Sequence, residues 1–193
     1  MSLRVLGVAG SLRRGSFNRA LLRAATELAP DGMAITIFDG LAAIPPYNAD
    51  VEAEGDPPPV TAWKSAIAAA DALLIATPEY NYGVPGVLKN AIDWASRPPG
   101  KSVLNGKPAA IMGATPGATG TTRAQLALRQ SFVFTNTCAL LQPEVLVARV
   151  HEKIDAAGRV TDAATRELVA QLLAAFADWV PRVGTAAGAT GAS

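Results

Sequence analysis

Short apolar runs alternate along this chain with longer segments in which apolar residues return every three or four positions. The runs at Val5–Ala9, Met33–Phe38, Ala72–Ala76, Ala109–Gly113 and Val145–Ala148 have the length and composition of β-strands. The first and third of them are nearly continuous, as in strands buried on both faces of a sheet. The pattern therefore predicts five strands.

The segments between these runs have helical spacing. The first helix is predicted to start after Ser16 and the last to run from about Thr161 to Val180, each with apolar residues on one face. Others are expected over 60–70, over the residues after Pro85, and over a segment carrying Leu126, Gln130 and Val133.

Strands that alternate with helices indicate an α/β fold with a parallel sheet. With right-handed crossovers, the flavodoxin-like order 2-1-3-4-5 follows, with helices on both faces of the sheet. Strands one and three are then neighbours, and the loops that follow them share one crevice. We expect one domain over residues 1–183 and a flexible tail of small residues over 184–193.

The loop after the first strand has the chemistry of an anion site. Gly10 ends the strand, and Ser16 is the expected N-cap of the next helix. Unpaired N–H groups and the helix dipole favour a phosphate at such a helix N-terminus. Ser11, Arg13 and Arg14 add a hydroxyl and positive charge. We expect a phosphate pocket here; the alternative is a capped turn that binds nothing.

The loop after the third strand is polar and aromatic. Tyr80, Asn81 and Tyr82 lie between prolines, and phenol rings beside an amide suit a flat heteroaromatic ring that needs stacking and hydrogen bonds. The alternative is that the tyrosines are ordinary surface residues. A phosphate on one strand end and a flat ring on its neighbour together describe FMN.

Composition narrows the class of protein. Of the 193 residues, 50% are hydrophobic and 17% charged, which is typical of a globular domain. A net charge of +1 provides no broad basic field for nucleic acid, and the apolar runs are too short to cross a bilayer. The N-terminus also lacks a signal-peptide pattern. We expect a cytoplasmic protein that binds neither nucleic acid nor membrane.

Three further features have ordinary explanations. Cys138 and His151 are the single cysteine and histidine, so no intrachain disulfide or Cys/His zinc site is expected, and no metal site is predicted. We interpret the thiol as a packing group and the histidine as a surface residue. The proline-rich stretch 41–59 is expected to be a long surface loop.

One acid raises a different possibility. Asp39 follows the second strand, where a Rossmann domain holds an adenosine ribose, but the first loop lacks the glycine pattern that accompanies this role. An NAD-binding Rossmann oxidoreductase remains an alternative at this point.

The segments GSLRRGSFNRAL and PEYNYGVPGVLKNAIDWASRP together resemble the NADPH-dependent FMN reductase family, which includes azoreductases, quinone reductases and chromate reductases. The resemblance extends from residue 3 to about 182. It implies an FMN phosphate loop and a loop for the isoalloxazine and ribityl groups. The residues concerned are Ser11, Arg13, Ser16, Phe17 and Asn18 in the first loop, and Pro78, Glu79, Tyr80, Asn81, Tyr82 and Gly83 in the second.

A third loop, after the fourth strand, is a further candidate. It carries Thr115 and Gly117 and departs from the serine and double glycine that the family often shows there. Its contact with the flavin is therefore an open expectation.

The resemblance also implies an activity. It points to hydride transfer from NADPH, with NADH possible, to FMN and then to a quinone, azo, metal-oxyanion or flavin acceptor by a ping-pong scheme. The cofactor carries this chemistry, so no catalytic side chain is assigned. The family is typically dimeric or tetrameric, and the loop at 46–48 could reach a neighbouring subunit. The alternative is a flavodoxin-like electron carrier or a regulatory flavin-binding protein.

Overall fold

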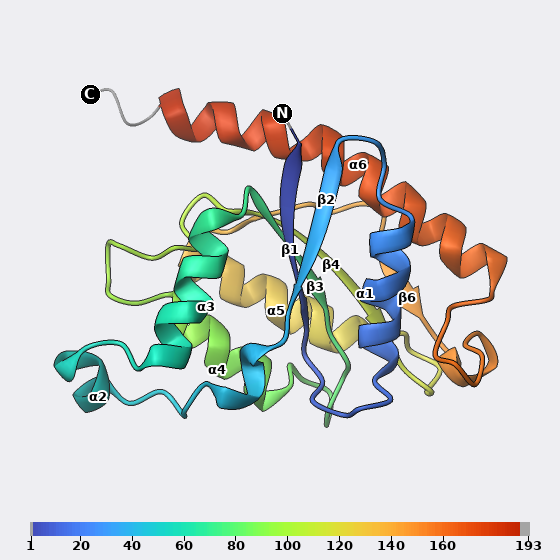
Figure 1. Ribbon diagram of the computed structural model, residues 1–193, viewed down its shortest axis with the longest axis horizontal. Coiled ribbons are helices and arrows are strands. Elements are labelled where there is room, and N and C mark those ends of the chain that lie inside the picture. The colour runs from blue at the N-terminus through green and yellow to red at the C-terminus, as the bar shows by residue number, and fades with distance from the viewer. Residues whose placement is uncertain (1, 190–193) are drawn as a thin grey trace.

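The computed structural model describes residues 2–189, in which strands and helices alternate as Figure 1 shows. The strands are β1 (Leu3–Ala9), β2 (Met33–Phe38), β3 (Ala72–Ala76), β4 (Pro108–Ala114), β5 (Cys138–Ala139) and β6 (Val145–Val147). The α-helices are α1 (Phe17–Glu27), α2 (Ala49–Glu54), α3 (Pro58–Ala69), α4 (Gly86–Ala95), α5 (Thr122–Thr135) and α6 (Ala163–Ala189), with short 3-10 helices η1 (Gly40–Ala43) and η2 (Val150–Glu152).

The strands pair in parallel in the order β2-β1-β3-β4-β5, which confirms the predicted flavodoxin-like topology. The fifth position differs from the prediction because two short strands share it. β5 pairs with the start of β4, where Pro108 lies opposite Cys138, and β6 pairs with its end, where Met112 lies opposite Val145. The run at 145–148 is therefore half of the edge rather than a complete fifth strand.

Two apolar cores cover the two faces of the sheet. Alternate strand residues face opposite sides, so Leu74 packs with α1 and α6 whereas its neighbour Leu73 packs with α3, α4 and α5. Both residues are almost fully buried. The continuous apolar runs of β1, β3 and β4 follow from burial on both faces.

The end of the last predicted helix needs correction, and the packing of α5 adds a feature that the sequence did not define. α6 continues to Ala189, beyond the predicted end near Val180, so the proposed tail begins inside this helix; residues 190–193 lie outside the described residues. On α5, Leu126, Gln130 and Val133 are exposed, and the buried face carries Leu128 and Phe132 instead. The predicted helix is present, and it packs on the face opposite the first three residues.

The stretch 41–59 is only partly the long loop that its prolines suggest. It contains the end of η1, all of α2 and the first two residues of α3. Side chains of α4 hold it in place, because Asn90 Nδ2 and Trp94 Nε1 both donate to the carbonyl of Pro45 at 2.8 Å. The backbone N–H of Tyr47 donates to Asn90 Oδ1 at 2.7 Å.

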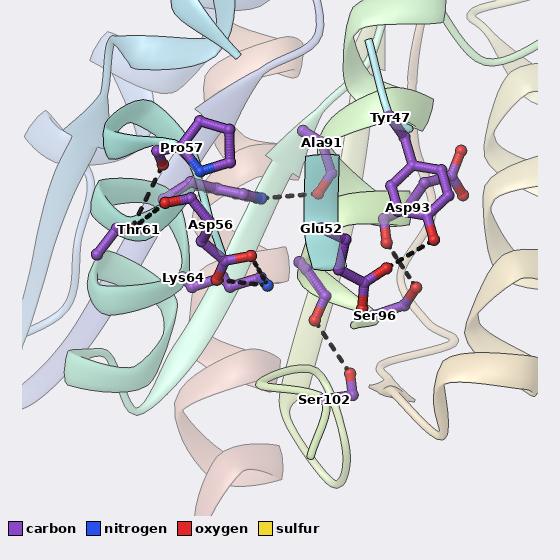
Figure 2. A network of polar contacts seen from close by, with 12 residues as sticks. Tyr47, Glu52, Asp56, Pro57, Thr61, Lys64, Ala91, Asp93, Ser96 and Ser102 are labelled. Carbon is purple, nitrogen blue, oxygen red and sulfur yellow. Dashed lines mark hydrogen bonds and ion pairs between the residues drawn. The ribbon is translucent and has the colours of Figure 1, made fainter. Parts of the chain in front are cut away.

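Polar contacts farther along this stretch fix it to α3 as well. Figure 2 shows the Tyr47 hydroxyl donating to Glu52, and Lys64 of α3 bonded to the carboxylate of Asp56; each of these bonds is 2.7 Å long. The Tyr47 ring also contacts Trp94 edge-on at 5.1 Å between centroids. Tyr47, which the sequence suggests as a residue that reaches a neighbouring subunit, is thus held by its own chain.

Candidate functional site

The loops after β1, β3 and β4 surround a cavity of about 450 Å³ at the carboxyl edge of the sheet. This is the edge at which open α/β sheets bind ligands. The cavity is lined by nine of the thirteen predicted site residues, Ser11, Arg13, Ser16, Phe17, Asn18, Pro78, Glu79, Tyr80 and Thr115, together with Ala114 and Pro116.

One end of the cavity is built to hold an anion. Ser16 is the N-cap of α1 and accepts a hydrogen bond from the N–H of Arg19 at 3.2 Å, which confirms its predicted capping role. The N–H groups of Phe17 and Asn18 have no recorded partner within residues 2–189. These donors, the Ser11 hydroxyl and the helix dipole suit a phosphate group.

Arg13 supplies the positive charge at this end. Its guanidinium carbon lies 4.7 Å from the centre of the Phe17 ring, and no carboxylate pairs with it in the described part of the chain. Two other arginines near this edge are already paired, Arg19 with Asp39 and Arg123 with Glu79. Arg13 is therefore available to a ligand.

Asn18 is at the predicted position, but its side chain has another partner. Its amide accepts from the N–H of Ala114 and donates to the carbonyl of the same residue, both at 2.9 Å. The side chain is buried and joins α1 to the end of β4. What Asn18 can offer a phosphate is its backbone N–H.

The carboxylate of Glu79 is likewise engaged within the protein. It accepts hydrogen bonds from the side chain of Arg123 at 2.7 Å and from the N–H groups of Arg123 and Ala124 at 3.0 and 3.3 Å. Burial raises the pKa of Glu79, but these bonds outweigh it and hold that pKa below its ordinary value. Glu79 is thus an anionic cap on α5, and only its backbone remains for a flavin.

The two tyrosines of the second loop lie on different sides. The Tyr80 hydroxyl donates to Ser11 Oγ at 3.2 Å and so joins the second loop to the first across the cavity. Asn81, Tyr82 and Gly83 form the tip of the loop and do not line the cavity. The sequence could not separate these residues, because adjacent positions in an aromatic loop look equally suited to a ligand.

The third loop reaches the cavity through part of its length. Thr115 lines it, and its side-chain oxygen accepts from the N–H of Gly117 at 3.2 Å. Gly117 itself does not line the cavity, and its carbonyl accepts from the N–H of Arg149 at 3.0 Å. Sequence reasoning missed Ala114 and Pro116, although both stand directly beside the predicted Thr115.

The described residues give less support to a dinucleotide site, to a metal site or to a membrane-spanning helix. The Asp39 carboxylate, which a Rossmann enzyme would offer to a ribose, pairs with Arg19. Within residues 2–189, no three His, Cys, Asp or Glu side chains gather in a way that could hold a metal ion. Over the same residues, no helix is both long and apolar enough to span a membrane.

The cavity fits FMN in its chemistry. One end offers free N–H groups, hydroxyls and an arginine for a phosphate. The remainder is lined by residues of the second and third loops, including the two prolines Pro78 and Pro116 and the aromatic Tyr80, which suits a flat heteroaromatic ligand. Its volume lies in the range of cofactor sites. The residues present therefore agree with the pairing of phosphate and flat ring that the sequence predicts.

Known proteins of the same kind support this assignment. The profile of a family described as NADPH-dependent FMN reductase matches residues 3–152. The chain is 52% identical over 181 residues to the NAD(P)H-dependent FMN reductase of Pseudomonas aeruginosa, covering 94% of this chain and 97% of that protein. It is 42% identical over 183 residues to the quinone reductase of Escherichia coli K12, covering 94% and 97%.

A solved structure has the same fold over nearly its whole length. It is that of FerB, a flavoenzyme NAD(P)H:(acceptor) oxidoreductase from Paracoccus denitrificans, with a TM-score of 0.84 and 36% identity over 93% of this chain and 98% of FerB. Both sequence motifs, the topology of the sheet and the cavity at its edge lead to the same conclusion: this chain belongs to the NADPH-dependent FMN reductase family.

Proposed function

We propose that this protein binds FMN at the carboxyl edge of its sheet and uses it to oxidise NADPH, or less readily NADH, and to reduce quinones and similar small acceptors. The observation that carries the proposal is the cavity whose anion-binding end lies at the N-terminus of α1 and whose other walls come from the loops after β3 and β4. The relatives named NAD(P)H-dependent FMN reductase and quinone reductase support the same activity.

The residues divide by role. Ser11, Arg13, Ser16 and the N–H groups of Phe17 and Asn18 hold the phosphate. Pro78, Glu79 and Tyr80, which line the cavity, supply backbone groups and aromatic surface for the ring system. Bound FMN supplies the redox chemistry, taking hydride from a reduced nicotinamide and delivering electrons to an acceptor.

The protein's part in the reaction is to bind and orient. The Tyr80 bond to Ser11 and the Glu79 bonds to α5 join the three loops to one another without any ligand. Such preorganisation lowers the cost of ordering the site when the cofactor and substrate bind. No proton transfer is assigned to a side chain.

Reconstitution tests the proposal directly. Purified protein that is mixed with FMN and then desalted should remain yellow. NADPH added without air should bleach this colour, and stopped-flow absorbance measures the reaction. A quinone added afterwards should restore the colour. An electron carrier would retain FMN but would not be bleached directly by NADPH, and a protein that stays colourless after reconstitution would contradict the assignment altogether.

We also propose that the protein forms a homo-oligomer through the exposed face of α5. This α5 patch consists of Leu126, Val133 and Phe134, with Leu141 beside them, and these side chains are 53%, 84%, 83% and 67% exposed. Clustered exposed apolar residues mark interaction sites on soluble proteins. The cytoplasmic location expected from the sequence stays a prediction.

A double substitution tests the α5 patch. Val133→Asp with Phe134→Asp should shift the protein towards the monomer in size-exclusion chromatography with light scattering, because each subunit would bury two carboxylates in the contact. Lys101→Asp, a charge change at an exposed position after α4, is the matched control and should leave the mass unchanged. An unaltered mass for the double variant would assign the contact to another surface.

A further inference from the structure

The tip of the second loop holds a tyrosine in a conformation that tyrosine rarely adopts. Tyr80 and Gly83 are joined by two backbone hydrogen bonds of 3.2 and 3.0 Å, which makes the loop a tight hairpin. Its two central residues, Asn81 and Tyr82, have φ values of +49° and +66°. Such turns favour Asn-Gly, because a bulky residue is strained there. A tyrosine at such a strained position implies that its side chain has a function.

Arg123 lies directly beneath that ring. Its guanidinium carbon is 3.5 Å from the centre of the Tyr82 ring, which is the distance of a close cation–π stack. The two residues come from different parts of the chain, since Tyr82 is in the loop after β3 and Arg123 is in the first turn of α5.

Hydrogen bonds from its N–H groups to Glu79 and Thr119 fix the plane of this guanidinium. Arg123 Nε donates to Glu79 Oε1 at 2.7 Å, and Nη2 approaches the same oxygen at 2.6 Å and the Thr119 hydroxyl at 3.1 Å. The Glu79 side chain is only 7% exposed. A planar fork held in this way offers a rigid floor that a lysine ammonium does not reproduce.

The other face of the Tyr82 ring remains available. The residue is 71% exposed and lies outside the cavity that holds the predicted flavin site, whereas Tyr80 in the same hairpin lines it. Tyr82 is therefore placed for a molecule that arrives at the cavity rather than for the cofactor inside it. A phenol ring is planar and electron-rich, so its open face suits stacking against a planar, electron-poor ligand such as a quinone, while the cation on its other face holds the ring in place.

We propose that Tyr82 is a stacking surface for planar acceptors at the entrance of the site, and that Arg123 is the positioning residue that holds its ring. This inference rests on the proposed function and assigns Tyr82 to the substrate rather than to FMN. Arg123 acts only through Tyr82, so its loss should have no further effect once the ring has been removed.

The test compares a planar acceptor with one that cannot stack. The holoprotein and its Tyr82→Gly, Arg123→Lys and double variants are assayed with 1,4-benzoquinone and with ferricyanide. Glycine accepts the positive φ, so the hairpin is kept, and lysine retains the charge that ferricyanide meets. Each single variant should raise the ratio of the benzoquinone KM to the ferricyanide KM by roughly tenfold. The double variant should match Tyr82→Gly alone.

Three controls keep the outcome decisive. Arg129→Lys, on the same helix but bonded to the Leu140 carbonyl, should leave the ratio of KM values unchanged. The Kd for FMN, measured by quenching of its fluorescence, and the melting temperature should stay near wild type in the two single variants. A tenfold weaker Kd, or an altered elution volume for Tyr82→Gly, would place the ring against the flavin or a second subunit and overturn the inference.

The two proposals also fail in different ways. If wild-type protein takes up no FMN or is not reduced by NADPH, the proposed function itself is wrong. If the wild type reduces both acceptors and Tyr82→Gly leaves the ratio of KM values unchanged, only the role of Tyr82 and Arg123 is wrong. Additive effects of the two substitutions would show that Arg123 does not act through the ring.

Discussion

Replacing Gly113 with alanine is expected to lower the free energy of unfolding by about 3 kcal/mol, the upper part of the range for overpacking a close-packed interior. A Cβ atom at this position would lie 1.9 Å from the Thr121 hydroxyl oxygen and 2.6 Å from the backbone carbonyl of Thr77. The Thr121 side chain could turn away, but the Thr77 carbonyl belongs to the end of the neighbouring strand and can move only with it. The variant should therefore unfold at a lower urea concentration.

Gly86→Ala is the matched control for this substitution. Gly86 opens α4, and a Cβ atom there would have no neighbour within 4 Å. Alanine should be neutral or should stabilise the helix by up to about 1 kcal/mol. If the two variants unfolded at the same urea concentration, the ends of β3 and β4 would be able to move apart at little cost in free energy. That result would also weaken the view that the three loops form a preorganised site.

The elements that the sequence predicted well are those with a local signal. The runs at 33–38 and 72–76 match β2 and β3 residue for residue. β3 is buried on both faces and is apolar throughout, whereas β2 is a partly exposed edge strand whose apolar residues alternate. Ser16 caps α1 as expected, since capping depends on a side chain three residues from its partner. The parallel order then follows from the alternation of elements.

The features that could not be predicted depend on partners far away in the chain. Asn18 and Glu79 are polar residues in ligand-type loops, so the sequence suggests that their side chains contact the cofactor. Their actual partners are Ala114 and Arg123, 96 and 44 residues farther along. Only the folded structure brings these pairs together, and both bonds hold the loops rather than a ligand.

The exposed face of α5 shows the same limit for apolar residues. Leu126 and Val133 are hydrophobic and helically spaced, which normally indicates the buried side. Leu128 and Phe132 mark a second apolar stripe on the same helix, and the sheet covers this one. When both faces of a helix are apolar, periodicity alone cannot decide which face packs inward. A contact with another subunit would account for the exposed stripe that carries Leu126 and Val133.

The largest functional effect is expected from Arg13→Ala, which should weaken FMN binding by about 10- to 100-fold. This is the loss expected when one charge-assisted hydrogen bond, worth about 1.5–3 kcal/mol, is removed. Arg13 lines the anion end of the cavity and has no carboxylate partner in the described chain. Removing it takes away the cation that faces the phosphate while the free N–H groups of α1 remain. Fluorescence titration of the apoprotein measures the change in Kd.

Riboflavin distinguishes a phosphate contact from a general loss of the site, because it has the same ring system and no phosphate. Its Kd should change less than threefold in Arg13→Ala, so the preference for FMN over riboflavin should nearly disappear. Arg23→Ala, farther along α1 and bonded to the Gly158 carbonyl, should leave both affinities unchanged. If both ligands lost affinity equally in Arg13→Ala, the residue would be supporting the Phe17 ring beneath it rather than the phosphate.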